Sequence, residues 1–188
     1  CLKGDPISQR INIEKVELYP DIAPNTVANF IKLANNGFYN TSTFHRVVKD
    51  FMIQGGSPNG DSQKSPTLKD LDPEKEEKEY VIKGEMSANG FTKNTLRHEE
   101  GVISVARVDY TKQLSPALTK ESYNSGNSQF FIMTKNTPSL NGMYTAFGKV
   151  IEGMDVVHKI EEAEIATETS ESGEVTSTET PANPPKIT

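Results

Sequence analysis

Arg46 is the residue whose type and setting most strongly suggest chemistry. It lies two positions after Phe44 in an apolar run, and this spacing on a strand places both side chains on one face. A guanidinium among apolar neighbours is costly unless something uses its donors. Two interpretations stay open on these residues alone: an arginine that acts on a bound ligand, and a surface arginine on a half-exposed strand.

Amide and apolar side chains that could line a groove occur at two other places. Gln129 and Phe131 share a face of a predicted strand, a pattern that more often marks the edge of a core than a site. Met52 and Gln54 also share a face. Phe51 would join them only through a local irregularity of the backbone.

Other chemistries lack the residues they need. The three histidines, His45, His98 and His158, are far apart and do not have metal-ligand spacing, so each is interpreted as an ordinary surface or core histidine. The glycine-rich run after Gln54 lacks the lysine of a phosphate-binding loop, and no Gly-x-Ser-x-Gly elbow is present. The lone Cys1 excludes an internal disulfide and a thiolate metal cluster. We expect no metal and no cofactor.

Three segments, in this order, carry a family resemblance. They are Phe-His-Arg-Val-Val-Lys-Asp-Phe-Met-Ile-Gln-Gly-Gly at 44–56, Asn-Ser-Gln-Phe-Phe-Ile at 127–132, and Leu-Asn-Gly at 140–142 followed by Ala-Phe-Gly-Lys-Val at 146–150. Together they resemble the cyclophilins, a family of peptidyl-prolyl cis-trans isomerases, in their bacterial single-domain type. The resemblance implies a mainly β fold: a closed eight-stranded antiparallel barrel capped by two α-helices, with long inserted loops.

The resemblance also implies the activity, which is rotation of Xaa-Pro bonds during protein folding. That reaction needs no nucleophile or base, only a weakening of amide resonance against a barrier of about 18 to 20 kcal/mol. Arg46 would point at the prolyl nitrogen and favour the twisted amide. By similarity, Gln54 binds substrate backbone. The implied pocket for the proline ring consists of Phe51, Met52, Phe131 and Leu140.

The other wall of the implied groove contains Ala106 and Arg107, which offer backbone contacts, with Gln129 beside them. Arg107 stands where an asparagine is common. Tyr144 stands where many members have histidine, and it can still supply a ring and a hydroxyl donor. Ser139 replaces a tryptophan that in eukaryotic members packs against cyclosporin, so we expect weak cyclosporin binding.

Two functions from different classes remain. One is an isomerase acting on proline-containing peptides and on client proteins. The alternative is a proline-peptide binding module of the same fold with little turnover. We expect a monomer, and no nucleic-acid partner because lysines and arginines are scattered.

The elements that position these residues follow from periodicity. Helices are predicted from Asp21 to Gly37, with an apolar stripe of Val27, Phe30, Ile31 and Ala34, and from Gly153 to Glu164. A strand from Ile11 to Tyr19 shows a phase slip at Lys15 that indicates a bulge. Six further strands are predicted: Thr43 to Val48, Phe51 to Gln54, Tyr80 to Lys83, Val102 to Val105, Gln129 to Met133 and Ala146 to Val150.

The length of 188 residues suits one domain. Charged or irregular stretches predict inserted loops at 57–79 and 108–126, and an acidic, Thr/Ser/Pro-rich flexible segment at 161–185. Seven glutamates from Glu161 to Glu179 account for the net charge of −6 and leave a nearly neutral body. No apolar window is long enough for a membrane span. A cytoplasmic location is expected, with a lipoprotein anchored through Cys1 as the alternative.

Overall fold

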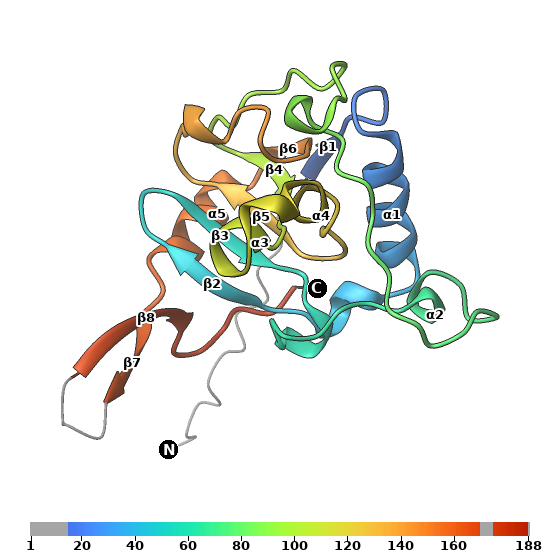
Figure 1. Cartoon of the computed structure of the whole chain (residues 1–188). Helices are drawn as coiled ribbons and strands as arrows, with labels where there is room; N and C mark the ends of the chain where they lie inside the picture. Colours follow the sequence, from blue (N-terminus) through green and yellow to red (C-terminus); the bar gives the residue numbers. More distant parts are fainter. Residues whose placement is uncertain (1–14, 170–174, 188) are drawn as a thin grey trace.

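A computed structural model describes residues 15–169 and 175–187 of the chain (Figure 1). The fold is mainly β and has one antiparallel sheet of six strands in the order β1-β6-β4-β5-β3-β2. These strands are β1 (Lys15–Leu18), β2 (Phe44–Val48), β3 (Met52–Gly55), β4 (Val102–Val105), β5 (Phe130–Met133) and β6 (Ala146–Glu152). A separate two-stranded sheet pairs β7 (Ile165–Thr169) with β8 (Val175–Pro181).

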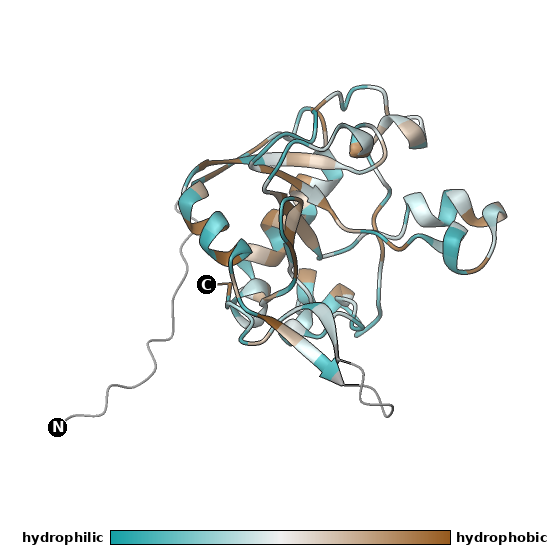
Figure 2. Ribbon diagram, turned by 90° about the vertical axis from the view of Figure 1, so that its left-hand side faces the viewer, coloured by the Kyte–Doolittle hydropathy of each residue, from teal (hydrophilic) through white to brown (hydrophobic). Residues whose placement is uncertain are grey.

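Five α-helices accompany the described strands. The two longer ones are α1 (Pro24–Asn35) and α5 (Met154–Glu161), and their buried faces belong to the main core. The shorter ones are α2 (Leu68–Leu71), α3 (Tyr110–Gln113) and α4 (Thr119–Tyr123). Hydropathy colouring shows brown, hydrophobic stretches in the central strands, while the helices and loops around them mix teal and brown residues (Figure 2). The prediction of two main helices therefore holds.

The main core contains a cluster of aromatic rings where α1 meets the sheet. Phe30 lies 5.6 Å from Phe130, 5.3 Å from Phe147 and 5.1 Å from Tyr39, measured between ring centroids. Tilted and edge-on ring pairs at such distances stabilise the folded protein by more than the burial of their apolar area alone would. This cluster holds β5 and β6 at fixed positions below the predicted groove.

The sheet confirms several predicted details. The register of β1 against β6 shifts between Lys15 and Val16, where the phase slip indicated a bulge. Strand β4 has the predicted bounds. Tyr80 to Lys83 is a correction: within this range only Ile82 pairs, through an isolated bridge to Gly126, and its amide donates to the Gly126 carbonyl at 2.8 Å. One bridge of this kind does not extend into a strand.

The predicted closed eight-stranded barrel is not what strand pairing shows among the described residues. Pairing runs from β1 to β2 and leaves these two strands as edges. Strands β7 and β8 pair with each other rather than closing the sheet. Part of the predicted strand from Ile11 to Tyr19 lies outside the described residues.

The face of helix α1 that is buried differs from the predicted apolar stripe. Val27 and Leu33 are buried and Phe30 is packed against the core, but Ile31 is 42% exposed and Ala34 is also exposed. The reason is a buried polar residue: Asn29 donates to the Asn127 carbonyl (3.0 Å) and accepts from the Tyr80 hydroxyl (2.7 Å). Hydrogen bonds from distant segments thus fix the face that a sequence pattern alone would leave outside.

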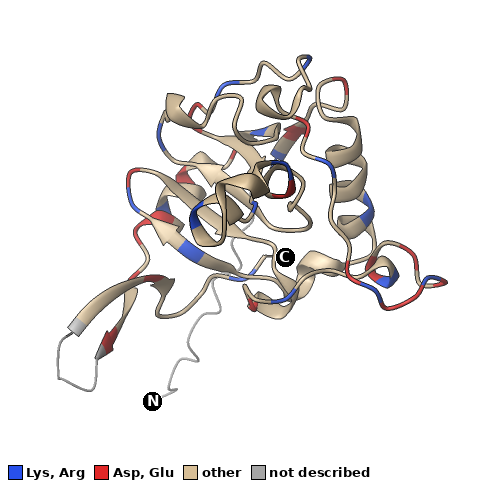
Figure 3. Ribbon diagram, viewed as in Figure 1, with Lys and Arg blue, Asp and Glu red and all other residues tan. Residues whose placement is uncertain are grey.

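The charged segment 57–79 contains more local structure than an inserted loop suggests. Thr67 and Asp70 form a capping box at α2, and Thr67 bridges to Glu79. The Asn36 side chain donates to the Asp70 carbonyl at 2.8 Å, which ties the segment to the end of α1. Acidic and basic residues alternate along its exposed outer part (Figure 3).

Segment 161–185 differs from the predicted flexible stretch, because its described parts form the β7–β8 hairpin and β8 lies against β2. Alternating threonines supply β propensity in this segment without any apolar periodicity. The chain then returns to the start of β2, where the Phe44 amide donates to the Pro185 carbonyl at 2.9 Å. Among the described residues, none of the helices has the length and apolar character that crossing a membrane requires.

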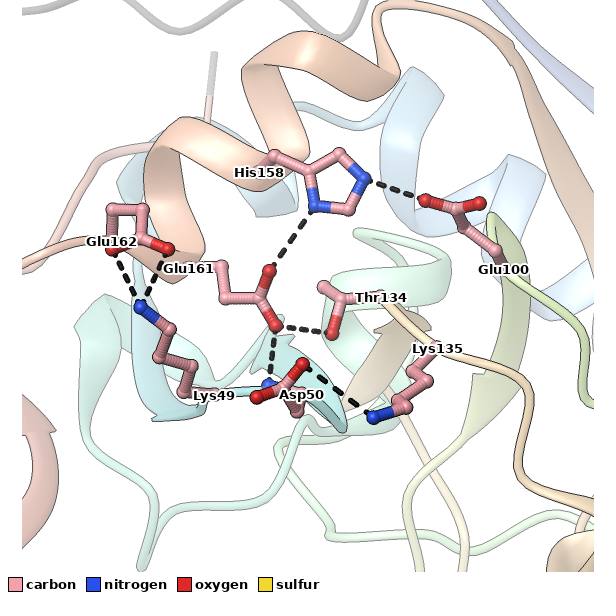
Figure 4. A network of polar contacts seen from close by, with 8 residues as sticks. All are labelled: Lys49, Asp50, Glu100, Thr134, Lys135, His158, Glu161 and Glu162. Carbon is pink, nitrogen blue, oxygen red and sulfur yellow. Dashed lines mark hydrogen bonds and ion pairs between the residues drawn. The ribbon is translucent and has the colours of Figure 1, made fainter.

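A polar network fastens α5 to three neighbouring loops, those of Asp50, Glu100 and Thr134 (Figure 4). His158 Nε2 lies 2.6 Å from Glu100 Oε1, and its Nδ1 lies 3.1 Å from Glu161 Oε2. Glu161 Oε1 accepts from the Thr134 hydroxyl (2.6 Å) and from the Asp50 amide (2.7 Å). The turn before β3 is thereby held against α5.

The network makes stability depend on pH. Hydrogen bonds to Glu161 and Glu100 raise the pKa of His158 above 6.5, so its contribution is complete below pH 6.5 and lost as pH rises through the raised value. For Glu161, burial opposes ionisation, but bonds from Thr134, His158 and Asp50 outweigh it and lower the pKa below 4.5. The contribution of Glu161 is lost only as pH falls through that lowered value. The network therefore stabilises most between pH 4.5 and 6.5.

We predict that His158→Gln lowers the melting temperature more at about pH 5.5 than at about pH 8.5, because only the protonated imidazole forms both ion pairs. Thermal melts of both proteins at the two pH values measure this. Lys159→Gln, at an exposed residue of the same helix, is the control and should show no such difference. An equal loss at both pH values would contradict the prediction.

Candidate active site

Nine of the ten predicted site residues line one cavity of about 210 Å³. They are Arg46, Phe51, Met52, Gln54, Ala106, Arg107, Phe131, Leu140 and Tyr144. The tenth, Gln129, lines an adjoining and more polar cavity of about 850 Å³ that also borders Arg46 and Gln54. The structure thus brings all ten residues to two connected hollows on one side of the sheet.

Strand register places the central side chains in a row. Arg46 on β2 is the partner of Gln54 on β3, Gln54 is the partner of Phe131 on β5, and Phe131 is the partner of Ser104 on β4. Paired residues of neighbouring strands project to the same face, so these four positions cross the sheet as one line. Met52 and Gln54 share a face, as strand parity predicts. The prediction that Phe44 and Arg46 share a face is wrong, because the register shifts between them: Phe44 is opposite Gly55 and packs in the main core, whereas Arg46 is opposite Gln54 and lines the cavity.

Phe51 joins the cavity through the irregularity that its position requires. It lies in the turn between β2 and β3, after Asp50, whose φ is 57°. The Phe51 amide donates to the Val48 carbonyl at 3.2 Å and closes that turn. Because Phe51 precedes the first residue of β3, strand alternation does not dictate its direction.

A chain of hydrogen bonds orients the polar wall. Arg46 Nη1 donates to Gln54 Oε1 at 3.3 Å, and Gln54 Nε2 donates to Gln129 Oε1 at 3.1 Å. Gln129 Nε2 then donates to the Ser62 carbonyl at 3.1 Å. Each amide donates on one side and accepts on the other, so the direction of the whole chain is set.

The floor of the cavity is apolar and buried. Phe131 is 5% exposed and Met52 is 2% exposed. The Tyr144 ring meets Phe131 edge-on at 5.5 Å, and the His98 ring stacks behind Phe131 at 6.1 Å. Burial lowers the pKa of His98, so the ring is neutral at pH 7, and its Nε2 lies 2.7 Å from the Ser104 hydroxyl.

Three comparisons with known proteins agree on a family. The model of cyclophilin type peptidyl-prolyl cis-trans isomerases matches residues 9–188. Peptidyl-prolyl cis-trans isomerase B of Bacillus subtilis is 38% identical over 157 residues, which cover 84% of this chain and 89% of that protein. The chain belongs to the cyclophilin-type peptidyl-prolyl cis-trans isomerases. The expected family and its activity as a rotamase are therefore confirmed.

Other cyclophilins resemble the chain in sequence and in structure. Peptidyl-prolyl cis-trans isomerase-like 1 of Rhizopus delemar is 34% identical over 77% of this chain and 72% of that protein. A cyclophilin of Cryptosporidium parvum superposes with a TM-score of 0.65 at 25% identity, over 92% of this chain and 85% of that one. The same protein solved in the presence of the dipeptide Ala-Pro gives a TM-score of 0.63, also at 25% identity, over 90% of this chain and 85% of that one. The fold described above is the cyclophilin fold.

The Arg107 side chain, which lines both cavities, is also held by neighbouring residues of this cyclophilin. Its guanidinium lies 4.5 Å from the centre of the Tyr144 ring and 5.2 Å from that of Tyr123, and Nε donates to the Met143 carbonyl at 3.2 Å. Tyr123 is in α4, within the predicted insertion 108–126. The insertion thus supports one wall of the groove.

Sequence reasoning missed Glu179 altogether. Arg46 Nε donates to its carboxylate in an ion pair. Glu179 is on β8, in the segment interpreted as flexible, and 133 residues separate it from Arg46. The alternating threonines around it could have indicated a strand, but nothing in the sequence indicates which strand it meets.

Proposed function

We propose that the chain rotates Xaa-Pro bonds in the 210 Å³ cavity, with Arg46 as the catalytic residue. Arg46 donates to Glu179 through Nε and to Gln54 through Nη1, and no other partner is found in the described part of the chain. Its Nη2 and one Nη1 hydrogen remain to face a substrate. The observation that carries the proposal is this oriented guanidinium at the rim of an apolar pocket.

The chemistry follows from what changes during rotation. Twisting the amide returns the lone pair to the prolyl nitrogen, and that nitrogen then accepts a hydrogen bond that the planar amide accepts poorly. A fixed cation at this point stabilises the twisted state more than the planar state, which is the requirement for catalysis. In this proposal Gln54 holds substrate backbone, while Phe131 and Met52 hold the ring.

The remaining predicted residues receive supporting roles. Phe51, Leu140 and Tyr144 complete the pocket walls, and Ala106, Arg107 and Gln129 offer polar contacts along the groove. Proline-containing peptides are the proposed substrates, as the Ala-Pro dipeptide present with the Cryptosporidium parvum relative supports. Client proteins would enter with an exposed Xaa-Pro bond.

A protease-coupled assay on a short Ala-Pro peptide tests turnover directly. The proposal predicts that protein at a concentration far below that of the peptide accelerates the cis-to-trans isomerisation of the Ala-Pro bond. Without a catalyst this isomerisation takes tens to hundreds of seconds at 25 °C. A proline-binding module of the same fold would bind the peptide and leave the rate of isomerisation unchanged.

We also propose that the sheet continues toward a closed barrel at its β2 edge. The bridge between Thr43 and Lys186 and the amide bond from Ile187 to the Ser42 carbonyl (2.9 Å) support this. They add the end of the described chain to the start of β2. Slow amide exchange at Ile187, comparable with that of β3, would agree with a continuous sheet.

Cyclosporin should inhibit this cyclophilin weakly. Ser139 is exposed and precedes Leu140, which lines the cavity. It lacks the ring area that an aromatic anchor contributes to binding, often about 2 kcal/mol or more. We predict that Ser139→Trp strengthens cyclosporin binding by about 30- to 150-fold, as measured by calorimetry. Turnover of a small Ala-Pro peptide should change little. Nanomolar inhibition of the unmodified protein would contradict the prediction.

A further inference from the structure

We propose that Glu179 sets the charge selectivity of the groove: it favours substrates with a basic side chain close to the prolyl bond over substrates with an acidic one. The inference rests on the proposed role of Arg46 and adds a specificity-determining residue to it. Glu179 comes from the β7–β8 hairpin and not from the sheet that carries the rest of the groove.

One oxygen of the Glu179 carboxylate is used and the other is available. Oε2 accepts from Arg46 Nε, whereas no contact to Oε1 occurs among the described residues. The side chain is 55% exposed, and it lines the 850 Å³ cavity together with Gln54 and Gln129. A cation on a bound peptide can therefore reach the free oxygen without breaking the ion pair to Arg46.

The hairpin presents this carboxylate at a fixed place. The Thr178 hydroxyl donates to the Ala166 carbonyl across the strands at 2.8 Å, and the Ala182 amide donates to the Glu164 carbonyl at 2.8 Å at the hairpin base. Strand β8 lies against β2, the strand of Arg46. The hairpin hydrogen bonds and the packing against β2 hold the Glu179 backbone in place. A carboxylate held in this way discriminates between substrates better than a freely moving one would.

The other charged groups of this cavity are engaged by neighbours. Lys64 forms an ion pair with Asp61 at 3.7 Å. The Asp109 carboxylate accepts a hydrogen bond from the Thr111 hydroxyl and forms an ion pair with Lys112. The Arg107 guanidinium lies over two tyrosine rings. Burial lowers the pKa of His45, which is neutral at pH 7 and lies 3.2 Å from the Ser57 hydroxyl.

The sign of the effect follows from the charges that would remain. Without Glu179 the cavity is lined by Arg46, Arg107 and Lys64 against Asp109 alone, and a positive cavity favours acidic peptides. Glu179 shifts that balance toward basic peptides whatever the starting preference. Because the carboxylate is half-exposed, salt should weaken its effect, the Debye length being about 10 Å at 0.1 M and about 3 Å at 1 M.

Exchange NMR on matched peptides tests the proposal. Each peptide has one Ala-Pro bond. A single lysine or glutamate is placed either one or two residues before the alanine, or one or two residues after the proline. For wild type and Glu179→Gln, the ratio of kcat/KM for the lysine peptide to that for the glutamate peptide is compared at each position. We expect Glu179→Gln to lower this ratio about three- to tenfold at one position or more, and 1 M salt to abolish the difference.

Glu168→Gln is the matched control, because it removes the same charge from an exposed residue of β7 that has no contact with Arg46. Its ratios should equal those of wild type. Unchanged ratios in Glu179→Gln at every position, in an enzyme that still needs Arg46, would overturn this proposal and leave the catalytic one intact. Activity that survives Arg46→Ala would instead remove the basis of both.

Discussion

Replacing Arg46 by alanine is expected to lower kcat/KM for an Ala-Pro peptide by about 30- to 1000-fold while the protein stays folded. The loss corresponds to about 2 to 4 kcal/mol of transition-state stabilisation, the usual scale for one oriented donor. The fold should survive because the Arg46 side chain is 39% exposed and belongs to no core cluster. A protease-coupled assay measures the rate, and circular dichroism verifies the fold.

Two variants sharpen this result. Arg46→Lys keeps the charge but lacks the planar fork that contacts Glu179 and Gln54 separately, so it should recover only a small part of the activity. Arg97→Ala removes a cation from an exposed residue that does not line the groove, and it should leave kcat/KM unchanged. A folded Arg46→Ala protein with wild-type kinetics would reject the assigned role.

Phe131→Ala should reduce stability and peptide binding together. The ring is 5% exposed, contacts Tyr144 and His98, and forms the floor of the cavity. Removing a buried phenylalanine costs about 3 to 5 kcal/mol, and we expect the lower end because the groove already opens on one side. KM should rise about tenfold or more as the proline ring loses its main contact.

The neighbouring residue provides the control for this prediction. Ile132 is 1% exposed and belongs to the main core on the opposite face of β5. Ile132→Ala should lower the melting temperature by a similar amount and leave KM near the wild-type value. If Phe131→Ala melts like wild type, the ring has been assigned to the wrong place.

The groove was accessible to sequence reasoning because its parts follow local rules. Strand parity predicts that Gln129 and Phe131 share one face and that Met52 and Gln54 share another strand's face, and the family motifs imply that these pairs and Arg46 meet in one groove. Strands β3 and β5 pair without a register shift, so parity gives the right face for Gln54 and Phe131. Strand β2 shifts its register between Phe44 and Arg46, so parity there gives the wrong face for Phe44. Where position in a strand decides direction, the sequence is sufficient.

The features that escaped prediction depend on contacts between distant segments. Asn29 is buried because Asn127 and Tyr80 satisfy its amide, and this turned α1 away from the expected stripe. Glu179 meets Arg46 because β8 lies against β2, and the threonine-rich strand has no apolar alternation to indicate it. Pairing partners of this kind are not visible in a single sequence.

The central claim is that Arg46 acts on the twisted amide rather than on peptide affinity. Exchange NMR on an Ala-Pro peptide tests it most directly, because one titration gives both the affinity and the isomerisation rate in the bound state. We predict that Arg46→Ala changes the affinity by less than about fivefold and slows bound-state isomerisation by about 30-fold or more. A mutant that isomerises bound peptide at the wild-type rate and has lost only affinity would contradict the claim.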